Sequence, residues 1–250
     1  MNPYFCDLHT HSALSPCGDG MMTPNNLAGM AALAGIQILA LTDHNTCKNC
    51  PAFFSACKRY GVVPIPGMEL TTAEEIHVVC LFPTLEAAMD FDKAVEARRM
   101  KIPNKEKIFG EQLIFDEEDN EIGRDPWFLP AATDIPLSEA PRLVKKHGGI
   151  CYPAHIDRPS GGVIEILGDF PPDVPFTAYE LNDINKKAEY EERFPILRTL
   201  HCVSGSDAHY LDQIRDAGFS LTLDDEPYSS AMLRMSLLKT LSATGGNSGR

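Results

Sequence analysis

The chain has 250 residues and a formal net charge of −13 at pH 7, with 22 basic residues against 35 acidic ones. This length is enough for one α/β barrel or for two small domains. Because no stripe of lysines and arginines accompanies the acidic balance, composition argues against a nucleic-acid backbone as the main partner.

The N-terminal residues, Met1 to Tyr4, lack a basic region followed by an apolar one, so we expect no secretory signal. The most apolar run, residues 27–41, is too short to cross a bilayer and is interrupted by Gly35 and Gln37. We therefore expect a cytoplasmic protein with no membrane partner and with its eight cysteines reduced.

Strands and helices are predicted to alternate from the start of the chain. A buried strand begins at residues 4–6, and Thr23 followed by Pro24 marks the start of a helix that Gly35 ends. Residues 36–41 form a continuous apolar run of strand length, as in a parallel sheet covered on both faces.

The same pattern continues with a helix over residues 52–60 and a strand over residues 62–66. Two prolines in that strand indicate an edge or irregular strand. A further strand over residues 76–82 and a helix over residues 85–99 follow.

Residues 101–136 break this rhythm and are interpreted as an insertion. Within it, residues 108–115 and 121–123 flank a polar turn, which indicates a strand and turn and favours a hairpin. Two interpretations stay open, an insertion over the mouth of a barrel and a plain surface excursion.

The pattern then resumes and predicts a single domain over residues 1–241. The expected elements are helices over residues 138–147, 186–200 and 229–241, and strands over residues 150–152, 177–181, 201–203 and 219–223. The tail, residues 242–250, is rich in glycine, serine and asparagine and is predicted to be disordered.

Six of the eight histidines lie in short polar motifs, most of them where an apolar run stops. The motifs are His9-x-His11, Thr42-Asp43-His44, Gly67-Met68-Glu69, Glu75-Ile76-His77, Pro153-Ala154-His155 and Ser206-Asp207-x-His209. In a parallel α/β architecture such positions are the carboxyl ends of strands, where active sites gather.

The spacing of these residues suits metal binding. His9 and His11 project to the same side of an extended backbone, and Glu69 and His77 can face one ion if the chain reverses between them. Imidazole plus carboxylate ligation suits Zn, Mn or Fe, and the ligands are too many for one ion. A structural zinc site would use four ligands with cysteines prominent.

The order of these motifs over residues 4–223 resembles the polymerase-and-histidinol-phosphatase (PHP) family of metal-dependent phosphoesterases. The resemblance implies an α/β fold, a distorted (β/α)7 TIM-like barrel with an inserted segment. It also implies two or three divalent transition-metal ions at the barrel mouth. The first ion would be held by His9, His11, Glu69 and Asp207, and the second by Glu69, His77 and His155.

In this resemblance Glu69 bridges ions roughly 3.5–4 Å apart, and a hydroxide between them is the nucleophile. A third position is built from His44 and His209 and needs one more ligand from the segment after His11. Many relatives have Ser-Asp-Gly or a further His there, whereas this chain has Ser15-Pro16-Cys17-Gly18-Asp19-Gly20. We take Asp19 as the candidate ligand and Cys17 as its competitor, and expect two tight ions and a weaker third.

Other polar residues are assigned supporting roles. Arg158 is expected to meet a phosphate through its paired donors, with a surface arginine as the alternative, and His44 or His209 to help the leaving group. Asp43 is expected to orient a ligand histidine, and Glu180 to line the substrate pocket.

Cys47 and Cys50 form a C-x-x-C motif, which raises a redox or zinc role. No second such pair accompanies it, so a structural role is the favoured interpretation.

The sequence thus predicts a metal-dependent phosphoesterase that hydrolyses a small phosphorylated metabolite, such as a nucleotide, a sugar phosphate or an amino-alcohol phosphate, by a metal-bridging hydroxide. The expected partner is this small-molecule phosphate ester. Two alternatives are a two-metal hydrolase of a non-phosphate bond and a non-catalytic, metal-stabilised binding module. The nearly complete ligand set argues against the module.

Overall fold

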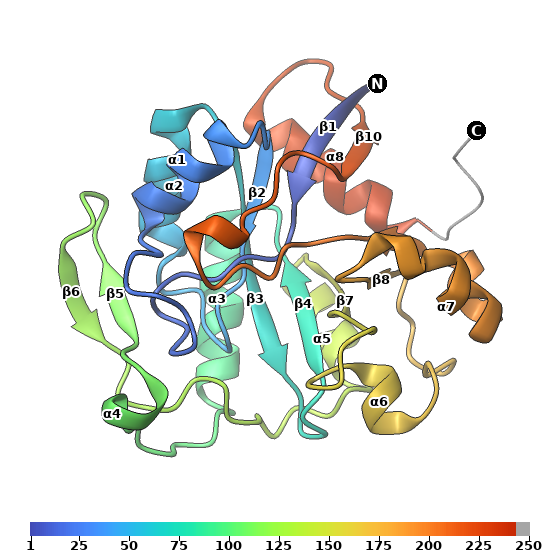
Figure 1. Ribbon diagram of the computed structural model, residues 1–250, viewed down its shortest axis with the longest axis horizontal. Coiled ribbons are helices and arrows are strands. Elements are labelled where there is room, and N and C mark those ends of the chain that lie inside the picture. The colour runs from blue at the N-terminus through green and yellow to red at the C-terminus, as the bar shows by residue number, and fades with distance from the viewer. Residues whose placement is uncertain (244–250) are drawn as a thin grey trace.

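The computed structural model describes residues 1–243, which form a curled, mixed β-sheet with helices on its outer surfaces (Figure 1). The strands are β1 (Asn2–Asp7), β2 (Ile38–Leu41), β3 (Val63–Thr71), β4 (His77–Leu81), β5 (Leu113–Phe115), β6 (Glu121–Arg124), β7 (Ile150–Pro153), β8 (Ala178–Glu180), β9 (His201–Val203) and β10 (Ser220–Leu223). The helices are α1 (Pro24–Leu33), α2 (Cys50–Tyr60), α3 (Leu85–Glu96), α4 (Glu106–Phe109), α5 (Ala140–Lys146), α6 (Val163–Leu167), α7 (Lys187–Arg193) and α8 (Ser230–Ser242). The expected α/β class is confirmed, with the barrel distorted into a curled half-barrel.

The main sheet has six strands in the order β10-β1-β2-β3-β4-β7, and β8 pairs with β9 in parallel. Strands β1, β2 and β3 are parallel, whereas β4 is antiparallel to both of its neighbours. Only residues 72–76 separate β3 from β4, which is too short for the crossover that a parallel pair needs. The chain therefore reverses between Glu69 and His77, as expected.

Backbone hydrogen bonds extend the curl beyond the main sheet. Ile156 N donates to Glu180 O at 2.9 Å, which connects the segment after β7 to β8. Asp207 N donates to His9 O at 2.8 Å, so the segment after β9 returns to the end of β1. Strand ends that are far apart in sequence therefore meet on one side of the half-barrel.

Strand β3 corrects the expectation of an edge strand, because it lies between β2 and β4 and is buried throughout. The pairing explains how it tolerates two prolines. Val63 N donates to Gln37 O on the β2 side, so the nitrogens of Pro64 and Pro66 point the other way. Pairing with β4 begins only at Gly67, and no ladder bond is lost.

Local signals account for most helix ends. The Thr23 side chain accepts a hydrogen bond from Asn26 N at the start of α1, and Gly61 ends α2 with φ of 72°. The helix expected over residues 186–200 is shorter, since Pro195 follows α7 and the chain continues as a 3-10 helix, Pro195–Thr199. Helix α6 was not expected from the sequence.

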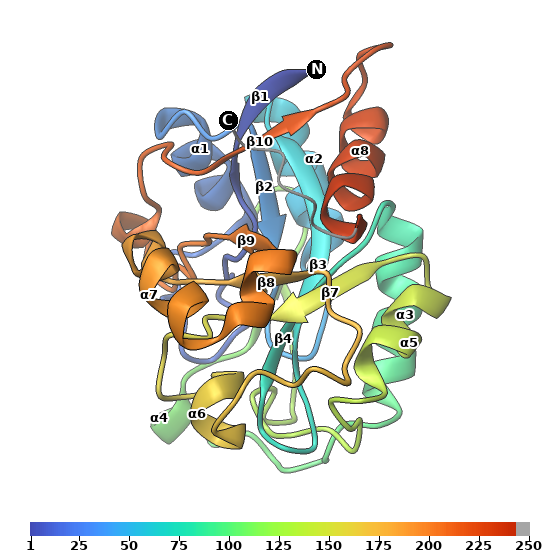
Figure 2. The ribbon, with the colours of Figure 1, turned by 90° about the vertical axis from the view of Figure 1, so that its right-hand side faces the viewer.

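Apolar side chains pack on both faces of the sheet. In β2, Leu39 and Leu41 join the cluster that contains Phe53 and Phe91, while Ile38 and Ala40 join a second cluster with α8. Helices α3 and α5 lie on the side opposite α6 and α7 (Figure 2). This two-sided burial is the arrangement that the apolar run of residues 36–41 predicts.

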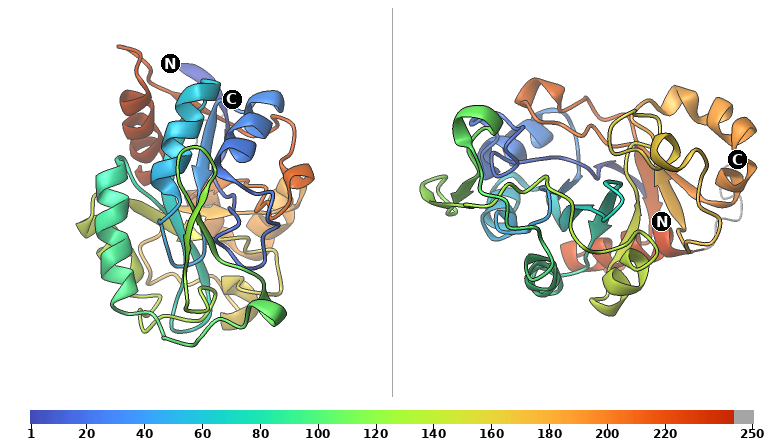
Figure 3. Two further views of the ribbon diagram at one scale, coloured as in Figure 1. Left: turned by 90° about the vertical axis from the view of Figure 1, so that its left-hand side faces the viewer. Right: turned by 90° about the horizontal axis from the view of Figure 1, so that it is seen from below.

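The inserted segment contains α4 and the expected hairpin, β5–β6, which is antiparallel and has one register shift. The hairpin and α7 lie at opposite ends of the molecule (Figure 3). No helix within residues 1–243 is long and apolar enough to cross a membrane. Of the tail expected to be disordered, Ser242 instead ends α8, and residues 244–250 lie outside the described residues.

Candidate metal centre

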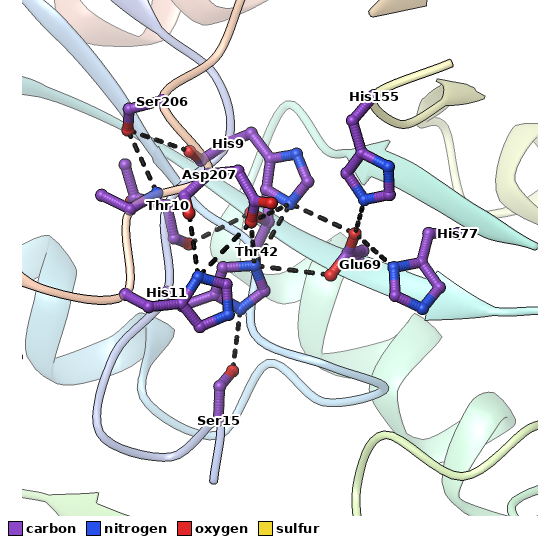
Figure 4. Close-up of polar contacts among 12 residues, drawn as sticks. His9, Thr10, His11, Ser15, Thr42, Glu69, His77, His155, Ser206 and Asp207 are labelled. Atoms are coloured by element: carbon purple, nitrogen blue, oxygen red, sulfur yellow. Dashed lines mark hydrogen bonds and ion pairs between the residues drawn. The ribbon is translucent and has the colours of Figure 1, made fainter. Parts of the chain in front are cut away.

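The motif histidines and carboxylates converge where the strands end on one side of the half-barrel (Figure 4). Their imidazoles lie close together, with ring centroids 4.2 Å apart for His11 and His209 and 5.8 Å for His9 and His155. His9, His11 and Glu69 are almost fully buried. Two buried carboxylates, Glu69 and Asp207, lie among these imidazoles and require a compensating positive charge.

The first group contains four side chains, His9, His11, Glu69 and Asp207, whose potential ligand atoms all lie within 4.8 Å of one another. The two Nε2 atoms of His9 and His11 are 3.2 Å apart. Asp207 Oδ1 lies 3.3 Å from His9 Nε2 and 3.0 Å from His11 Nε2. This is the set that the family resemblance assigns to the first ion.

Hydrogen bonds to the outer ring nitrogens orient these imidazoles. Glu180 accepts from His9 Nδ1 at 2.9 Å, and Ser15 Oγ lies 2.9 Å from His11 Nδ1 while donating to Asp43 Oδ1 at 2.7 Å. These acceptors place the protons on Nδ1 and turn both Nε2 atoms inward, as in metal-bound histidines. Asp43 acts through Ser15, and Glu180 is buried behind His9 instead of lining a substrate pocket.

Some cation must lie between the inward Nε2 atoms. Burial alone would lower the pKa of His9, but Glu180, Asp207 and Glu69 outweigh it and raise this pKa well above the usual value. Burial lowers the pKa of His11, and His209 and His44 add to the decrease. In the metal-free protein a proton on His9 therefore supplies the positive charge, and a metal ion can replace this proton.

Glu69 contacts histidines through both carboxylate oxygens. Its Oε1 lies 2.9 Å from His77 Nδ1 and 3.1 Å from His155 Nε2. Its Oε2 lies 2.9 Å from His44 Nδ1 and 3.4 Å from His11 Nε2. The sequence analysis assigned His77 and His155 to the second ion, and both meet the same oxygen.

The donor set fits metal ions. Among residues 1–243, the buried side-chain atoms that have no hydrogen-bond partner include Glu69 Oε2, Asp207 Oδ1 and His44 Nδ1, all in this cluster. Burial would raise the pKa of Glu69, but the surrounding imidazoles, His77 first, hold it well below its usual range. Two ionised carboxylates, each with one oxygen that has no hydrogen-bond partner and faces imidazole nitrogens, form a suitable ligand set for divalent transition metals.

Two further groups join His44, Glu69 and His77, and His11, His44 and His209. Neither Cys17 nor Asp19 belongs to any of these groups of potential ligands within residues 1–243. Asp19 Oδ1 accepts a hydrogen bond from Met21 N at 2.8 Å. Cys17 instead faces the imidazoles, with Sγ 3.3 Å from His44 Nε2. Partial desolvation would raise the pKa of the Cys17 thiol, which keeps an exposed edge, but His209 and His44 lower this pKa to about 6.

Unusual backbone angles and two glycines mark the same place. His155 has φ of 25° and Asp207 φ of 50°, values that side chains disfavour and that concentrate at functional sites. A Cβ atom at Gly161 would lie 2.6 Å from the His77 ring, and one at Gly205 would lie 2.6 Å from His9 Cβ. The importance of these glycines was not recognised from the sequence.

Arg158 lies at the rim of the cluster. Its Nη1 contacts Asp207 Oδ2, and its Nη2 donates to Asn182 Oδ1 at 2.9 Å. The side chain is 37% exposed, so the guanidinium borders both the buried ligands and solvent. Cys47 and Cys50 are buried near the backbone of Gly67, and neither belongs to a ligand group of the described chain.

A groove of about 830 Å³ opens directly beside the cluster. His44, His77 and Cys17 line one part of it, and the inserted segment lines another with Phe109 and Phe128. The two phenylalanine rings have centroids 4.4 Å apart, and Phe109 is 40% exposed. The insertion therefore borders the site, which favours the first of its two interpretations.

The PHP domain family model matches residues 7–121, which confirms the resemblance. A 5'-3' exoribonuclease of Haemophilus influenzae is 35% identical over 101 residues, or 37% of this chain and 36% of that protein. This chain thus matches only about a third of the relative's length.

Solved structures support the fold. A lesion-specific endonuclease from Pyrococcus furiosus superposes with a TM-score of 0.65 at 17% identity, covering 98% of this chain and 57% of that one. A chain from Bifidobacterium adolescentis, described as a metal-dependent phosphoesterase, superposes with a TM-score of 0.54 at 18% identity. The superposition covers 93% of this chain and 95% of that one.

These comparisons correct one expectation. A small-molecule partner was expected and nucleic acid was not, yet the exoribonuclease and the endonuclease are nucleases by name. The inference from net charge was wrong because net charge describes the whole protein, whereas a substrate responds to the local field at the site. Bound cations would dominate that local field.

Proposed function

We propose, from the premise that this chain is a PHP-domain protein, that it is a metal-dependent phosphoesterase that cleaves phosphodiester bonds in nucleic acid. The observation that carries the proposal is the position of Glu69 beside an open groove. Its Oε1 faces His9, His77 and His155, and its Oε2 faces His11 and His44. One carboxylate between two sets of histidines is suited to bridging two ions.

The proposed ligands surround Glu69, and His155 is included for its contact with Glu69 Oε1. His9, His11, Glu69 and Asp207 would hold one ion, and Glu69, His77 and His155 a second. Zinc, manganese and iron suit these donors. When bound, such ions polarise phosphoryl oxygens and supply a nucleophile at neutral pH.

The remaining polar residues would act on the substrate. The exposed part of the Arg158 guanidinium would bind a phosphate oxygen, since its fork matches that geometry. His44 lines the groove, and His209 lies in the same group of imidazoles. We assign to these two residues the proton for the leaving oxygen.

The groove supports a nucleic-acid substrate. Phe109 and Phe128 pack against each other at a tilt beside the groove, and Phe109 offers a partly exposed aromatic surface. Unpaired bases stack on such side chains with little regard to sequence, each contributing roughly 1–3 kcal/mol. A strand end with its phosphate at the ligand cluster and a base on Phe109 fits this arrangement.

The test uses end-labelled single-stranded RNA and DNA oligonucleotides, a phosphate monoester and a carboxylic ester, each with Mn²⁺ or Zn²⁺. We expect metal-dependent cleavage of an oligonucleotide, with a KM about ten-fold higher for Phe109→Ala, the size of one lost stacking contact. Ile122→Ala, which removes an exposed apolar side chain from the hairpin, is the matched control.

Other outcomes would contradict the proposal. Turnover of the carboxylic ester alone would indicate a hydrolase of non-phosphate bonds. Metal binding without turnover of any substrate would indicate a metal-stabilised binding module. The expected cytoplasmic location stays a prediction.

A further inference from the structure

We propose that the Cys17 sulfur is a ligand of a third metal position, together with His44 and His209. This inference rests on the proposed metal-dependent function and adds a donor of different chemistry to it. Sulfur would make the third position softer than the two positions around Glu69.

The imidazole geometry leaves a place for this ligand. His44 directs Nδ1 to Glu69 and Nε2 to Cys17 Sγ, at 2.9 and 3.3 Å. His209 Nδ1 lies 2.8 Å from Asp207 O, which leaves its Nε2 as the free ring nitrogen. One ring nitrogen from each of His11, His44 and His209 lies within 4.8 Å of the other two. Three converging imidazoles without a carboxylate of their own form an incomplete ligand set.

The loop after His11 presents Cys17 and turns Asp19 away. Gly18 N donates to Ser15 O at 2.8 Å, and a Cβ atom at Gly18 would lie 2.9 Å from Ser12 O, so this tight turn requires glycine. Asp19 N donates to His209 O at 2.9 Å, while its carboxylate accepts from Met21 N. Asp19 therefore anchors the loop on the His209 backbone, and this anchor brings Cys17 to the imidazoles.

Accessibility separates Cys17 from the other thiols. Among the cysteines of residues 1–243, Cys17 alone is exposed, Cys202 is partly buried and the rest are buried. Cys17 also lines the groove beside His44 and His77. An ion can thus reach this sulfur from solvent without any rearrangement of the core.

The ligand types predict a metal preference. Thiolate and imidazole donors favour zinc and cobalt, whereas carboxylate-rich sites also accept manganese. We expect the third position to take Zn²⁺ or Co²⁺ and to stay weakly occupied when Mn²⁺ is the only ion present.

The experiment titrates metal-free protein with Co²⁺ and records the near-ultraviolet absorption that a thiolate ligand gives to cobalt. Wild-type protein should develop this band with its last equivalent of Co²⁺. Cys17→Ser should lose the band and one equivalent of bound metal, and the matched loop variant Asp19→Asn should keep both. Protection by Zn²⁺ against alkylation of Cys17, measured by mass spectrometry, provides a second readout without substrate.

The result that overturns the inference is a Cys17→Ser protein with unchanged metal stoichiometry and an unchanged band. Loss of one equivalent in Asp19→Asn but not in Cys17→Ser would assign the position to Asp19. Both results are read from metal stoichiometry and the cobalt band, so they differ from failure of the proposed function, which is read from the absence of oligonucleotide cleavage.

Discussion

Glu180 accepts a hydrogen bond from His9 Nδ1 at 2.9 Å, although the two residues are 171 positions apart in the sequence. The carboxylate is fully buried, and its contact with His9 directs the opposite ring nitrogen toward Asp207 and Glu69. The hydrogen bond between β8 and the segment after β7 holds Glu180 in place, and Glu180 in turn determines which ring nitrogen of His9 is available to a metal ion.

Removing this acceptor should weaken metal binding without removing a ligand. Glu180→Gln should lower affinity for the first ion by about 10- to 100-fold, the usual effect of losing the partner of a ligand histidine. Competition with a chelator of known affinity measures this change. Glu189→Gln, on the surface of α7, is the control and should behave as wild type. Equal affinities in all three proteins would mean that Glu180 has only a structural role.

Because both oxygens of Glu69 contact histidines, substitution of Glu69 and substitution of His155 should differ in how much metal the protein loses. Glu69→Gln keeps the shape of the side chain but weakens contacts to both histidine sets, so both ions should be lost together. His155→Ala removes a contact to Oε1 alone and should mainly empty the second position. Elemental analysis of protein prepared without chelator gives the stoichiometries. A Glu69→Gln protein that retains its full metal content would disprove the bridge.

The protonation of His9 predicts a pH dependence. Nearby carboxylates raise the pKa of His9, so the metal-free site holds a proton at neutral pH that an ion must displace. The pKa values of Glu69 and Asp207 are lowered, so these groups are already ionised and release none. Metal affinity should therefore increase with pH up to the raised pKa of His9.

Calorimetry in two buffers of different ionisation enthalpy measures this release. We expect about one proton released for the first ion near neutral pH, because His9 alone changes state. An apparent binding enthalpy that is the same in both buffers would show that the ion displaces no proton.

Much of this site could be predicted from the sequence because its ligands follow apolar runs, and strand ends of an α/β sheet meet on one side. His9, His11 and Asp207 illustrate this, since short motifs carry them directly at strand ends. The first helix was equally predictable, because Thr23 caps it by a local contact.

Features that depend on distant contacts could not be predicted in this way. The role of Glu180 depends on how β8 closes onto its neighbours, and the central position of β3 depends on where β4 begins to pair. The choice between Cys17 and Asp19 depends on a hydrogen bond from the loop to His209. Residue type alone contains none of this information.

Variants of Arg158 should distinguish phosphoester hydrolysis from hydrolysis of other bonds. Its guanidinium contacts Asp207 Oδ2, whereas Oδ1 of the same carboxylate faces His9 and His11. Arg158→Ala should therefore retain bound metal but lower kcat/KM on an oligonucleotide by about 10²- to 10³-fold, the cost of one preorganised charge contact. Arg158→Lys should recover only part of this loss, because an ammonium cannot reproduce the paired donors.

The control for Arg158 is a carboxylic ester turned over by the same metal-loaded protein. The loss should be large for the phosphodiester and small for this ester, since only the phosphodiester presents oxygens that match the guanidinium fork. Equal losses on both substrates would mean that Arg158 supports Asp207 and general binding. An unchanged rate on the oligonucleotide would exclude Arg158 from the reaction and leave the ions and the imidazoles of His44 and His209 to stabilise the phosphoryl charge.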